Sequence, residues 1–480
     1  MKQRIPAHRS TLRAVLVAAV ALLASCGGGG NDNAPSTVQV LLKDGDTLPG
    51  NFTVATVESA NMANDRTVAV IASQPGTPAL NGVFLRSPDG GIQPILTPAS
   101  TLPDGLTLTK VGKLAMSTDG DFSFDLGGQL DNEAVFLYSK GTLSIAARTD
   151  PGSTPPGFRV LGERRIADGG VIAFSDGTSP CTVDQTGGSQ RVNCSLRVFT
   201  GDIKGVTQLT LPAQLDSQST DSVSVIMNNT SGRLALGLPA RSKQPLVGFV
   251  ENGQFQNLIN RQDALPGLGT ILSANPRAIG AEGTLAINAR FDTDGDGVID
   301  KDRVLVESGG QLTAIAETGV PAGTKVVQKV DARDVDANGR VVFTALFGDP
   351  ASTDGKISLR VWENGAMREI AYEGESYGQD ANGKDEKILQ IGTIRLSDGG
   401  DVIFVASMGN TDNGTTQTTE TRILRDAGAG LETVLKTGTT IPGQGQLVLL
   451  EIADINDTGD ILTIVGLDRK TNRGLVLVPR

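Results

Sequence analysis

The stretch Asp336-Ala-Asn-Gly339-Arg-Val-Val-Phe343 combines a polar turn, a glycine and a run of β-branched and aromatic residues. The same pattern returns around seven glycines along the chain: Gly120, Gly170, Gly232, Gly283, Gly339, Gly400 and Gly459. A degenerate first copy, Ala63-Asn-Asp-Arg66-Thr-Val-Ala-Val70, has an arginine at the glycine position. Counted from Arg66, these positions lie 54, 50, 62, 51, 56, 61 and 59 residues apart. Such a period is typical of a repeat architecture and not of a series of unrelated domains.

The repeated glycines are predicted to occupy turns with positive φ, a conformation that glycine adopts without steric cost. Phenylalanine follows four of them at the same spacing, as Phe124, Phe174, Phe343 and Phe404. Because these aromatic residues recur in strand register, we expect them to be core residues that pack between neighbouring sheets.

Each repeat unit is predicted to contain four antiparallel strands. In the unit that follows Gly339, these are residues 340–347, 357–362, 367–371 and 388–394. The second and third segments alternate in polarity and flank Glu363-Asn364-Gly365, and Asn-Gly between alternating segments is a strong hairpin signal. Four-stranded sheets that repeat around a channel make a β-propeller, in which only short edges are exposed.

The two ends of the chain complete this arrangement. Strand-like segments at 38–42 and 52–57 complement those at 461–465 and 474–479, and together they supply one further sheet. We therefore predict one all-β domain, residues 37–480: a β-propeller of eight four-stranded blades, closed by pairing the N- and C-terminal strands. Seven blades plus a degenerate unit are the alternative. An open solenoid is disfavoured, because it would have no use for complementary partial units at both ends.

The N-terminal residues have the features of an export signal. Lys2, Arg4, Arg9 and Arg13 precede or begin an apolar run that extends from residue 14 to 24. The end of this run, Leu23-Ala24-Ser25-Cys26, resembles the lipobox of bacterial lipoproteins, in which the signal is removed before the cysteine and lipid is attached to its sulfur. An ordinary signal or a short membrane anchor is the alternative, although the run is short for a span.

The lipobox resemblance implies three segments and a location. Residues 1–25 are the expected signal peptide, and residues 26–36 combine the lipidated Cys26 with a flexible Gly/Asn-rich tether. Gly27 follows the cysteine where aspartate would favour inner-membrane retention. The resemblance therefore implies an outer-membrane lipoprotein of the bacterial cell envelope, in either leaflet.

The repeat itself resembles the bacterial tandem-repeat proteins with an N-x-x-G-x-x-A-F pattern that carry various surface anchors, the choice-of-anchor repeat family. The match is fullest at residues 167–174, and asparagine occupies the first position only at Asn229 and Asn456. This family is functionally uncharacterised, so the resemblance implies a propeller-like surface domain and no reaction.

Composition excludes several classes of function. The chain has a net charge of −11, and removal of the signal with its four basic residues leaves 38 basic against 53 acidic residues, or −15. This charge argues against nucleic acid as a partner. The single histidine, His8, lies in the signal. The mature chain therefore lacks the imidazole needed for Ser-His-Asp or Cys-His catalysis and for His-ligated zinc.

One repeat contains a candidate metal loop between two predicted strands, residues 284–291 and 303–307. Its candidate ligands follow a D-x-D-x-D-G-x-x-D pattern and are Asp292, Asp294, Asp296, Val298 (through its carbonyl), Asp300 and Asp302. Alternating carboxylates with a glycine at the bend are similar to EF-hand calcium loops. Arg303 occupies the twelfth position, where an EF-hand has glutamate, so Asp300 or Asp302 must complete the site. We expect structural calcium in a β-hairpin, similar to the loops of integrin-type propellers; a solvated acidic turn is the alternative.

Cys181 and Cys194 are predicted to form a disulfide, because two non-lipidated cysteines of an exported protein are expected to pair. Such a bridge would close a long hairpin and contribute about 3 kcal/mol in the chain-entropy model. A redox-active pair is disfavoured, because the spacing is not C-x-x-C.

Two classes of function fit these observations. The first is a non-catalytic binding or scaffold propeller, monomeric and anchored to the membrane through Cys26, with a protein or glycan partner. The second is a carboxylate-dependent enzyme, such as a glycosidase, with its site at the channel. The second class needs raised carboxyl pKa values and usually aromatic platforms. Trp362, the one tryptophan, lies in an alternating strand and is expected to be packed. Binding is the preferred reading, since a fold alone implies no activity.

Overall fold

The computed structural model divides the chain into two units, Met1–Asp32 and Asn33–Arg480. It describes residues 38–76, 80–102, 110–127, 134–148, 161–176, 197–211, 223–238, 245–349, 355–379, 383–412, 415–469 and 471–480, all in the second unit. The signal, the tether, Cys26, Cys181 and Cys194 lie outside these residues. The lipidation and the disulfide therefore stay predictions.

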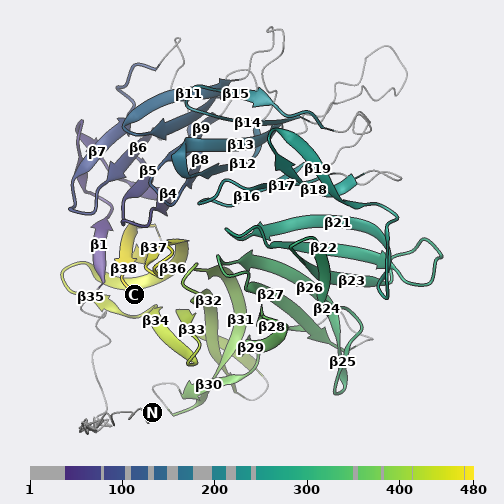
Figure 1. Cartoon of the computed structure of the whole chain (residues 1–480). Helices are drawn as coiled ribbons and strands as arrows, with labels where there is room; N and C mark the ends of the chain where they lie inside the picture. The colour runs from purple at the N-terminus through teal and green to yellow at the C-terminus, as the bar shows by residue number, and fades with distance from the viewer. Residues whose placement is uncertain are drawn as a thin grey trace, which may run out of the picture. The chain divides into compact units, whose positions relative to one another are not determined.

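The second unit is an all-β propeller of eight blades (Figure 1). The first blade contains β4 (Thr56–Met62), β5 (Val68–Ser73), β6 (Asn81–Arg86) and β7 (Ile92–Leu96). The second contains β8 (Lys110–Met116), β9 (Phe122–Gly127), β10 (Ala134–Ser139) and β11 (Thr142–Arg148). The third contains β12 (Leu161–Ala167), β13 (Val171–Asp176), β14 (Val198–Asp202) and β15 (Gly205–Gln208). The fourth contains β16 (Ser224–Met227), β17 (Leu234–Gly237), β18 (Pro245–Glu251) and β19 (Gln254–Asn260).

The later blades carry a further short strand at their start. The fifth contains β20 (Ala264–Leu265), β21 (Gly269–Ile279), β22 (Leu285–Asp292), β23 (Lys301–Ser308) and β24 (Gln311–Glu317). The sixth contains β25 (Pro321–Ala322), β26 (Lys325–Val335), β27 (Val341–Gly348), β28 (Gly355–Glu363) and β29 (Ala366–Tyr372). The seventh contains β30 (Ser376–Gln379), β31 (Asp385–Leu396), β32 (Val402–Asp412), β33 (Thr415–Asp426) and β34 (Leu431–Lys436). Among the described residues, the one helical element is the 3-10 turn η2 (Asp168–Gly170).

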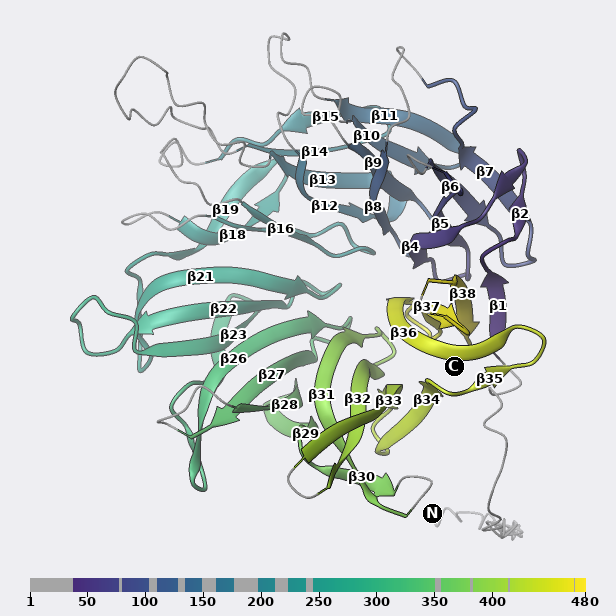
Figure 2. The same ribbon diagram turned by 180° about the vertical axis from the view of Figure 1, so that it is seen from behind.

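The eighth blade closes the ring with strands from both ends of the chain. It contains β35 (Thr440–Ile441), β36 (Gly445–Ile455), β37 (Ile461–Leu467), β38 (Arg473–Val478) and the N-terminal β1 (Gln39–Leu42). β1 pairs antiparallel with β38, with Gln39 opposite Leu477. This pairing confirms the predicted closure and the count of eight. The two views in Figures 1 and 2 agree in placing β1 beside β38.

The closure differs from the prediction in one detail. The segment expected at 52–57 does not join the eighth blade: β3 (Phe52–Thr53) pairs with β2 (Thr47–Leu48), and β4 begins the first blade. One N-terminal strand completes the eighth blade, because the C-terminal segment already supplies the three strands inside it, β36, β37 and β38.

The predicted grouping of strands within a repeat was also wrong by one strand. Residues 388–394, placed last in the unit after Gly339, belong to β31, which pairs with β32 in the following blade. The repeated glycine turn therefore lies inside each blade, between its first two long strands. The period of the sequence determines the spacing of the turns but not where one sheet ends and the next begins. A turn within a sheet and a turn between two sheets give the same repeat.

The innermost strands form a closed circle. They are β4, β8, β12, β16, β21, β26, β31 and β36, and each contacts the innermost strand of both neighbouring blades. The apolar core lies between the faces of adjacent blades: Phe124 packs in a cluster with Ile71 of the first blade, and Phe404 packs with Leu359 of the sixth. All four phenylalanines predicted as core residues are no more than 1% exposed.

Candidate functional site

The repeated turns contain residues with positive φ at the glycine position. The seven glycines have φ between 69° and 93°, and Arg66 in the degenerate copy has φ of 71°. A side chain at this position is strained in a left-handed conformation, and glycine avoids that strain. Arg66 is therefore the exceptional member of the set.

These turns also join neighbouring blades, and we call them collectively the turn ring: residues 63–66, 117–120, 167–170, 229–232, 280–283, 336–339, 397–400 and 456–459. Hydrogen bonds between adjacent turns include Asn64 N to Thr118 O, Thr118 Oγ1 to Asp168, Asp168 N to Asn229 O, Ala337 N to Asp398 Oδ1, Gly399 N to Asp457 O and Asp457 N to Asn64 Oδ1, at 2.7–3.0 Å. Beside them, Asn228 Nδ2 donates to Ile279 O at 3.3 Å. Between the fifth and sixth turns, a Cβ on Gly280 would clash with the Asp336 carbonyl oxygen, so the two turns approach closely here. The turns thus connect the blades around the axis.

A cavity of about 310 Å³, which we call the axial pocket, lies beside the turn ring. Residues from six innermost strands or their turns line it, including Arg165, Arg277, Arg333 and Arg395. A second cavity of about 360 Å³ shares Arg165 with it and is bordered by Lys113. No aromatic side chain is among the described residues that line the axial pocket. The pocket therefore presents charged and amide groups to a ligand.

Two aspartates of the pocket wall connect adjacent innermost strands. Asp334 Oδ2 accepts a hydrogen bond from Leu396 N at 3.1 Å, and its Oδ1 accepts from Val335 N at 3.0 Å. Asp454 makes the equivalent connection to β4, because its Oδ2 accepts from Met62 N at 2.9 Å. Both residues lie five positions before a turn glycine. Burial raises the pKa of Asp334 to about 6 and also raises the pKa of Asp454.

Asp398 is the third pocket carboxyl with a perturbed pKa. Burial, followed by the negative charge of Asp457, raises the pKa of Asp398 to about 6. Its Oδ1 accepts a hydrogen bond from Ala337 N at 2.8 Å. Asp398 thus belongs both to the turn ring and to the wall of the pocket.

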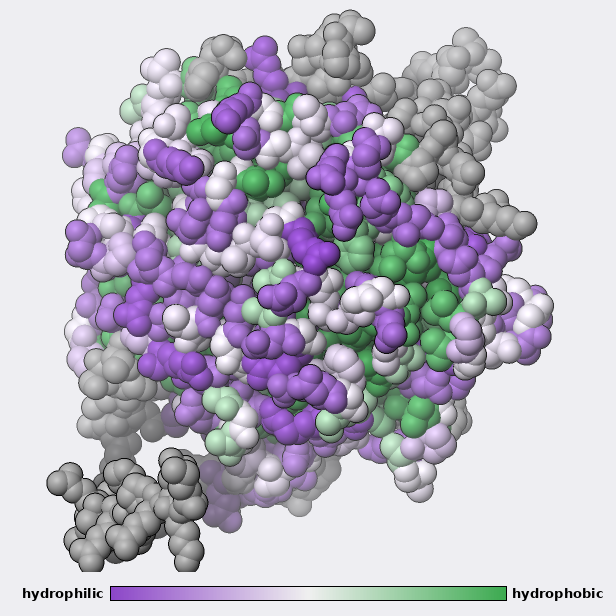
Figure 3. Space-filling model, in the orientation of Figure 1, coloured by the Kyte–Doolittle hydropathy of each residue, from purple (hydrophilic) through white to green (hydrophobic). Residues whose placement is uncertain are grey.

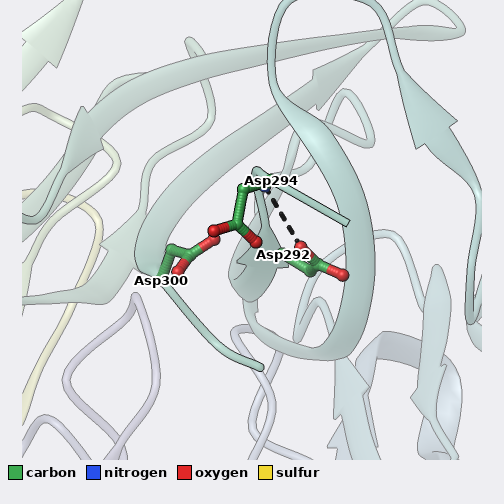
Figure 4. Close-up of side chains that lie close together, drawn as sticks. All are labelled: Asp292, Asp294 and Asp300. Atoms are coloured by element: carbon green, nitrogen blue, oxygen red, sulfur yellow. Dashed lines mark hydrogen bonds between the residues drawn. The ribbon is translucent and has the colours of Figure 1, made fainter. Parts of the chain in front are cut away.

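The predicted metal loop lies between β22 and β23, as the sequence indicated. Carboxylate oxygens of Asp292, Asp294 and Asp300 lie within 4.8 Å of one another (Figure 4). Asp292 is 5% exposed, and its oxygens accept hydrogen bonds from Gly295 N at 2.6 Å and Gly297 N at 2.8 Å. These bonds lower the pKa of Asp292. Bonds from the Thr293 amide and hydroxyl similarly lower the pKa of Asp300.

The other candidate ligands of this loop have other contacts. Asp296 Oδ1 accepts from Val298 N at 2.7 Å, and Asp302 Oδ1 lies 3.4 Å from Arg290 Nε. Arg303 is 5% exposed, and its guanidinium lies 4.6 Å from the centre of the Phe291 ring. A hard cation, which prefers oxygen ligands, fits the three converging carboxylates. Asp302 lies outside that group.

The outer surface is mainly polar on the face seen in Figure 3, with hydrophobic side chains exposed over the region of β21 and β22. Among the described residues, the exposed large hydrophobic side chains include Val298 and Ile299 of the metal loop. The described part of the chain includes no helix that is long and apolar enough to cross a membrane.

Comparison with known proteins gives a family match over part of the chain. Residues 335–475 match a family of unknown function (DUF7453). No curated protein matches the sequence. The match covers the outer three strands of the sixth blade, the whole seventh blade and most of the eighth.

Solved propeller structures are similar to the chain at low sequence identity. The Dos1 propeller is 9% identical with a TM-score of 0.45, covering 91% of this chain and 96% of that one. The β-propeller domain of the Trilobed protease from Pyrococcus furiosus is 11% identical with a TM-score of 0.42, covering 80% and 98%. Oligogalacturonate lyase from Vibrio parahaemolyticus is 10% identical with a TM-score of 0.38, covering 92% and 97%. These similarities carry no inference about activity.

The sequence patterns described above did not identify the pocket arginines. A signal for them exists, because Arg165 and Arg395 lie five residues before a turn glycine, and Arg277 and Arg333 lie six residues before one. The turn glycines thus provide a frame in which pocket residues can be located.

Proposed function

We propose that this chain is an exported lipoprotein, attached to the bacterial outer membrane through Cys26, whose propeller is a non-catalytic binding module. The observation that carries the choice of binding over catalysis is the composition of the axial pocket. Its described lining combines four arginines with amide and carboxylate groups and has no aromatic platform. Binding through such a set of donors and acceptors requires no reactive group.

Two of the three pocket carboxyls with raised pKa values, Asp334 and Asp454, support the same choice. Both oxygens of Asp334 accept backbone N–H groups, as do both oxygens of Asp454. Carboxylates used in this way hold adjacent strands together. Trp362 packs against the apolar cluster between the fifth and sixth blades, which agrees with a structural role.

A carboxylate-dependent enzyme, such as a glycosidase, is the second candidate. Asp398 favours it, because a carboxyl with a pKa of about 6 beside Asp457 has the electrostatics of a general acid. Hydrolysis of aryl glycosides by the purified chain, abolished in Asp398→Asn, would establish this alternative over the binding module.

We further propose that the metal loop binds calcium in a structural role. Asp292, Asp294 and Asp300 would supply carboxylate oxygens. A bound cation would neutralise acidic groups that otherwise repel one another and would thereby fix the hairpin between β22 and β23. The partner of the module is a protein or glycan of the envelope, and the acidic chain disfavours nucleic acid.

Labelling of cells with an alkyne fatty acid tests the anchoring. The wild-type chain should incorporate the label and sediment with outer membranes, whereas Cys26→Ser should incorporate none and leave that fraction. Label retained in Cys26→Ser, or wild-type chain without label, would rule out lipidation of Cys26. Cys181→Ser is the matched control and should be labelled normally.

A further inference from the structure

The centre of this acidic protein gathers basic side chains. β12, β21, β26 and β31 each supply one arginine to the axial pocket: Arg165, Arg277, Arg333 and Arg395. Lys113 of β8 borders the adjoining cavity. The whole chain has a net charge of −11. Like charges that line one cavity raise one another's energy unless an anion lies near them.

The hydrogen-bonding capacity of these arginines is largely unused by the described protein groups. The hydrogen bonds of Arg165 and Arg395 go to the carbonyl oxygens of their own preceding residues, at 3.0 Å each, and neither guanidinium has a carboxylate within ion-pair distance among the described residues. Arg277 and Arg333 share the single carboxylate of Asp331, at 3.5 and 3.1 Å. A guanidinium has five N–H donors, so each retains several for a ligand.

Carboxylates also border the pocket, and each of them accepts at least one hydrogen bond from the protein; the charge of Arg395 acts on two of them, Asp334 and Asp454. Those facing the arginines are Asp331, Asp334, Asp398, Asp454 and Asp457. They accept hydrogen bonds from Asn288 Nδ2, Leu396 N, Ala337 N, Met62 N and Asn64 Nδ2 respectively, at 2.5–3.1 Å. Each carboxylate in the pocket wall is therefore held by at least one protein donor, while many guanidinium donors have no hydrogen-bond partner among the described residues.

Arg165 and Arg395, which have no ion pair among the residues that the structure describes, limit the shape of a ligand by their positions. Arg165 belongs to the third blade and Arg395 to the seventh, four places apart in a ring of eight. They consequently lie on opposite walls of one cavity, and the arginines of the fifth and sixth blades lie between them. A ligand with a single negative group could engage one wall only.

We propose that the axial pocket binds a compact polyanion with two or more carboxylate or phosphate groups, held between Arg165 and Arg395. This inference rests on the proposed binding function and specifies the anionic groups that the axial pocket recognises. Guanidinium groups suit this chemistry, because their planar fork donates two parallel hydrogen bonds to a carboxylate or phosphate. A cavity of about 310 Å³ is within the range of small-molecule sites.

Titration calorimetry tests the proposal with the full-length chain, purified in mild detergent at low ionic strength. The probes are citrate for carboxylates, pyrophosphate for phosphates and acetate for a single charge. We expect one-to-one binding of citrate, pyrophosphate or both, and none of acetate at equal concentration. The arm that binds identifies the anionic group. Absence of binding by both polyanions would overturn the proposal.

Variants locate the site. Arg165→Gln/Arg395→Gln should weaken polyanion binding at least tenfold, whereas Arg290→Gln/Arg360→Gln, with the same change in net charge outside the pocket, should bind as wild type. Equal losses in both double variants would overturn the proposal. Arg165→Lys/Arg395→Lys keeps the charge without the fork and should show an intermediate loss, which provides the test if the glutamine variant does not fold.

The two proposals can fail separately. If the polyanion binds and is chemically converted, the non-catalytic function is wrong and the polyanion site stands. If no polyanion binds to a chain that is lipidated and without hydrolytic activity, the proposed function stands and the polyanion site is wrong.

Discussion

Arg66 offers the sharpest test of how the ring is closed, because it stands where the other seven repeats have glycine. Its Nε and Nη2 donate to the two carboxylate oxygens of Asp460 in the eighth blade, at 2.8 and 3.0 Å. The arginine thus joins the first blade to the last. The left-handed backbone at Arg66, with φ of 71°, costs about 1 kcal/mol relative to glycine.

The free energy that the pair contributes follows from the titration of Asp460. Burial would raise its pKa, but hydrogen bonds led by that of Arg66 leave the pKa of Asp460 at about 2, against 3.8 for the ordinary carboxyl. A shift of this size corresponds to about 2.4 kcal/mol, which is the net of the opposing effect of burial and of all donors, Arg480 N and Asn456 included. Because the Arg66 side chain is 44% exposed, we assign it about 1–1.5 kcal/mol.

Urea unfolding of the full-length chain at pH 7 measures both contributions. Arg66→Ala loses the pair and keeps the strain, so its free energy of unfolding should fall by about 1–1.5 kcal/mol. Arg66→Gly loses the pair but relieves the strain, and should lie within about 0.5 kcal/mol of wild type. Arg290→Ala, which removes an exposed pair at 3.4 Å, is the control and should change stability by less than about 0.5 kcal/mol.

The pH dependence separates the ion pair from other effects of the substitution. Since the pKa of Asp460 is depressed in the folded state, its contribution is complete above pH 3.8 and is lost as the pH falls toward 2. The difference between wild type and Arg66→Ala should shrink over that range. Equal destabilisation by Arg66→Ala and Arg66→Gly would contradict the backbone strain assigned to Arg66. A difference between wild type and Arg66→Ala that does not depend on pH would contradict the contribution of the ion pair with Asp460.

Two further predictions concern the metal loop and the pocket wall. Calcium at a hundred times its dissociation constant should stabilise the chain by about 2.7 kcal/mol relative to chelator, as measured by thermal unfolding. Asp294→Ala should abolish this stabilisation. Asp302→Asn, which changes a residue outside the group of converging carboxylates, should retain it. For Asp334, the folded pKa of about 6 lies above 3.8, so its stabilising contribution is present below pH 3.8 and lost as pH rises through 6. Relative to Asp334→Asn, the free energy of unfolding of wild type should therefore fall by about 2 kcal/mol between pH 4 and pH 8. The full pKa shift would correspond to about 3 kcal/mol, and we reduce it because the side chain keeps some exposed surface. Parallel pH profiles of the two proteins would contradict this prediction.

The sequence predicted the class of fold and the number of blades for a definite physical reason. Alternating strands and glycine turns are local features, and each recurs often enough to be recognised. Phe124 and Phe404 were identified as core residues because they hold one register after the turn. The phase of the repeat was not predictable, because the turn before β27 looks the same whether it lies within a sheet or between two sheets.

The metal loop shows the limit of a motif. The sequence identifies where carboxylates are concentrated, but not which of their oxygens the backbone uses. The carboxylates of Asp292, Asp294 and Asp300 lie close together, whereas Asp302 belongs to β23 and forms an ion pair with Arg290. That difference depends on where the strand begins, and the D-x-D-x-D pattern contains no information about it.

The axial pocket was missed because the residue types at its positions do not repeat from blade to blade. The position five residues before the turn glycine is Arg165 in one blade, Met227 in the next and Asp334 in another. The turn ring, in contrast, needs a positive φ and close approach in almost every blade, so its glycines repeat. In a closed ring, the packing of the blades accounts for what repeats, and any specific chemistry must come from positions where one copy differs from the others. Arg66 at the seam and the arginines of the pocket are such positions, which is why we direct the functional tests to them.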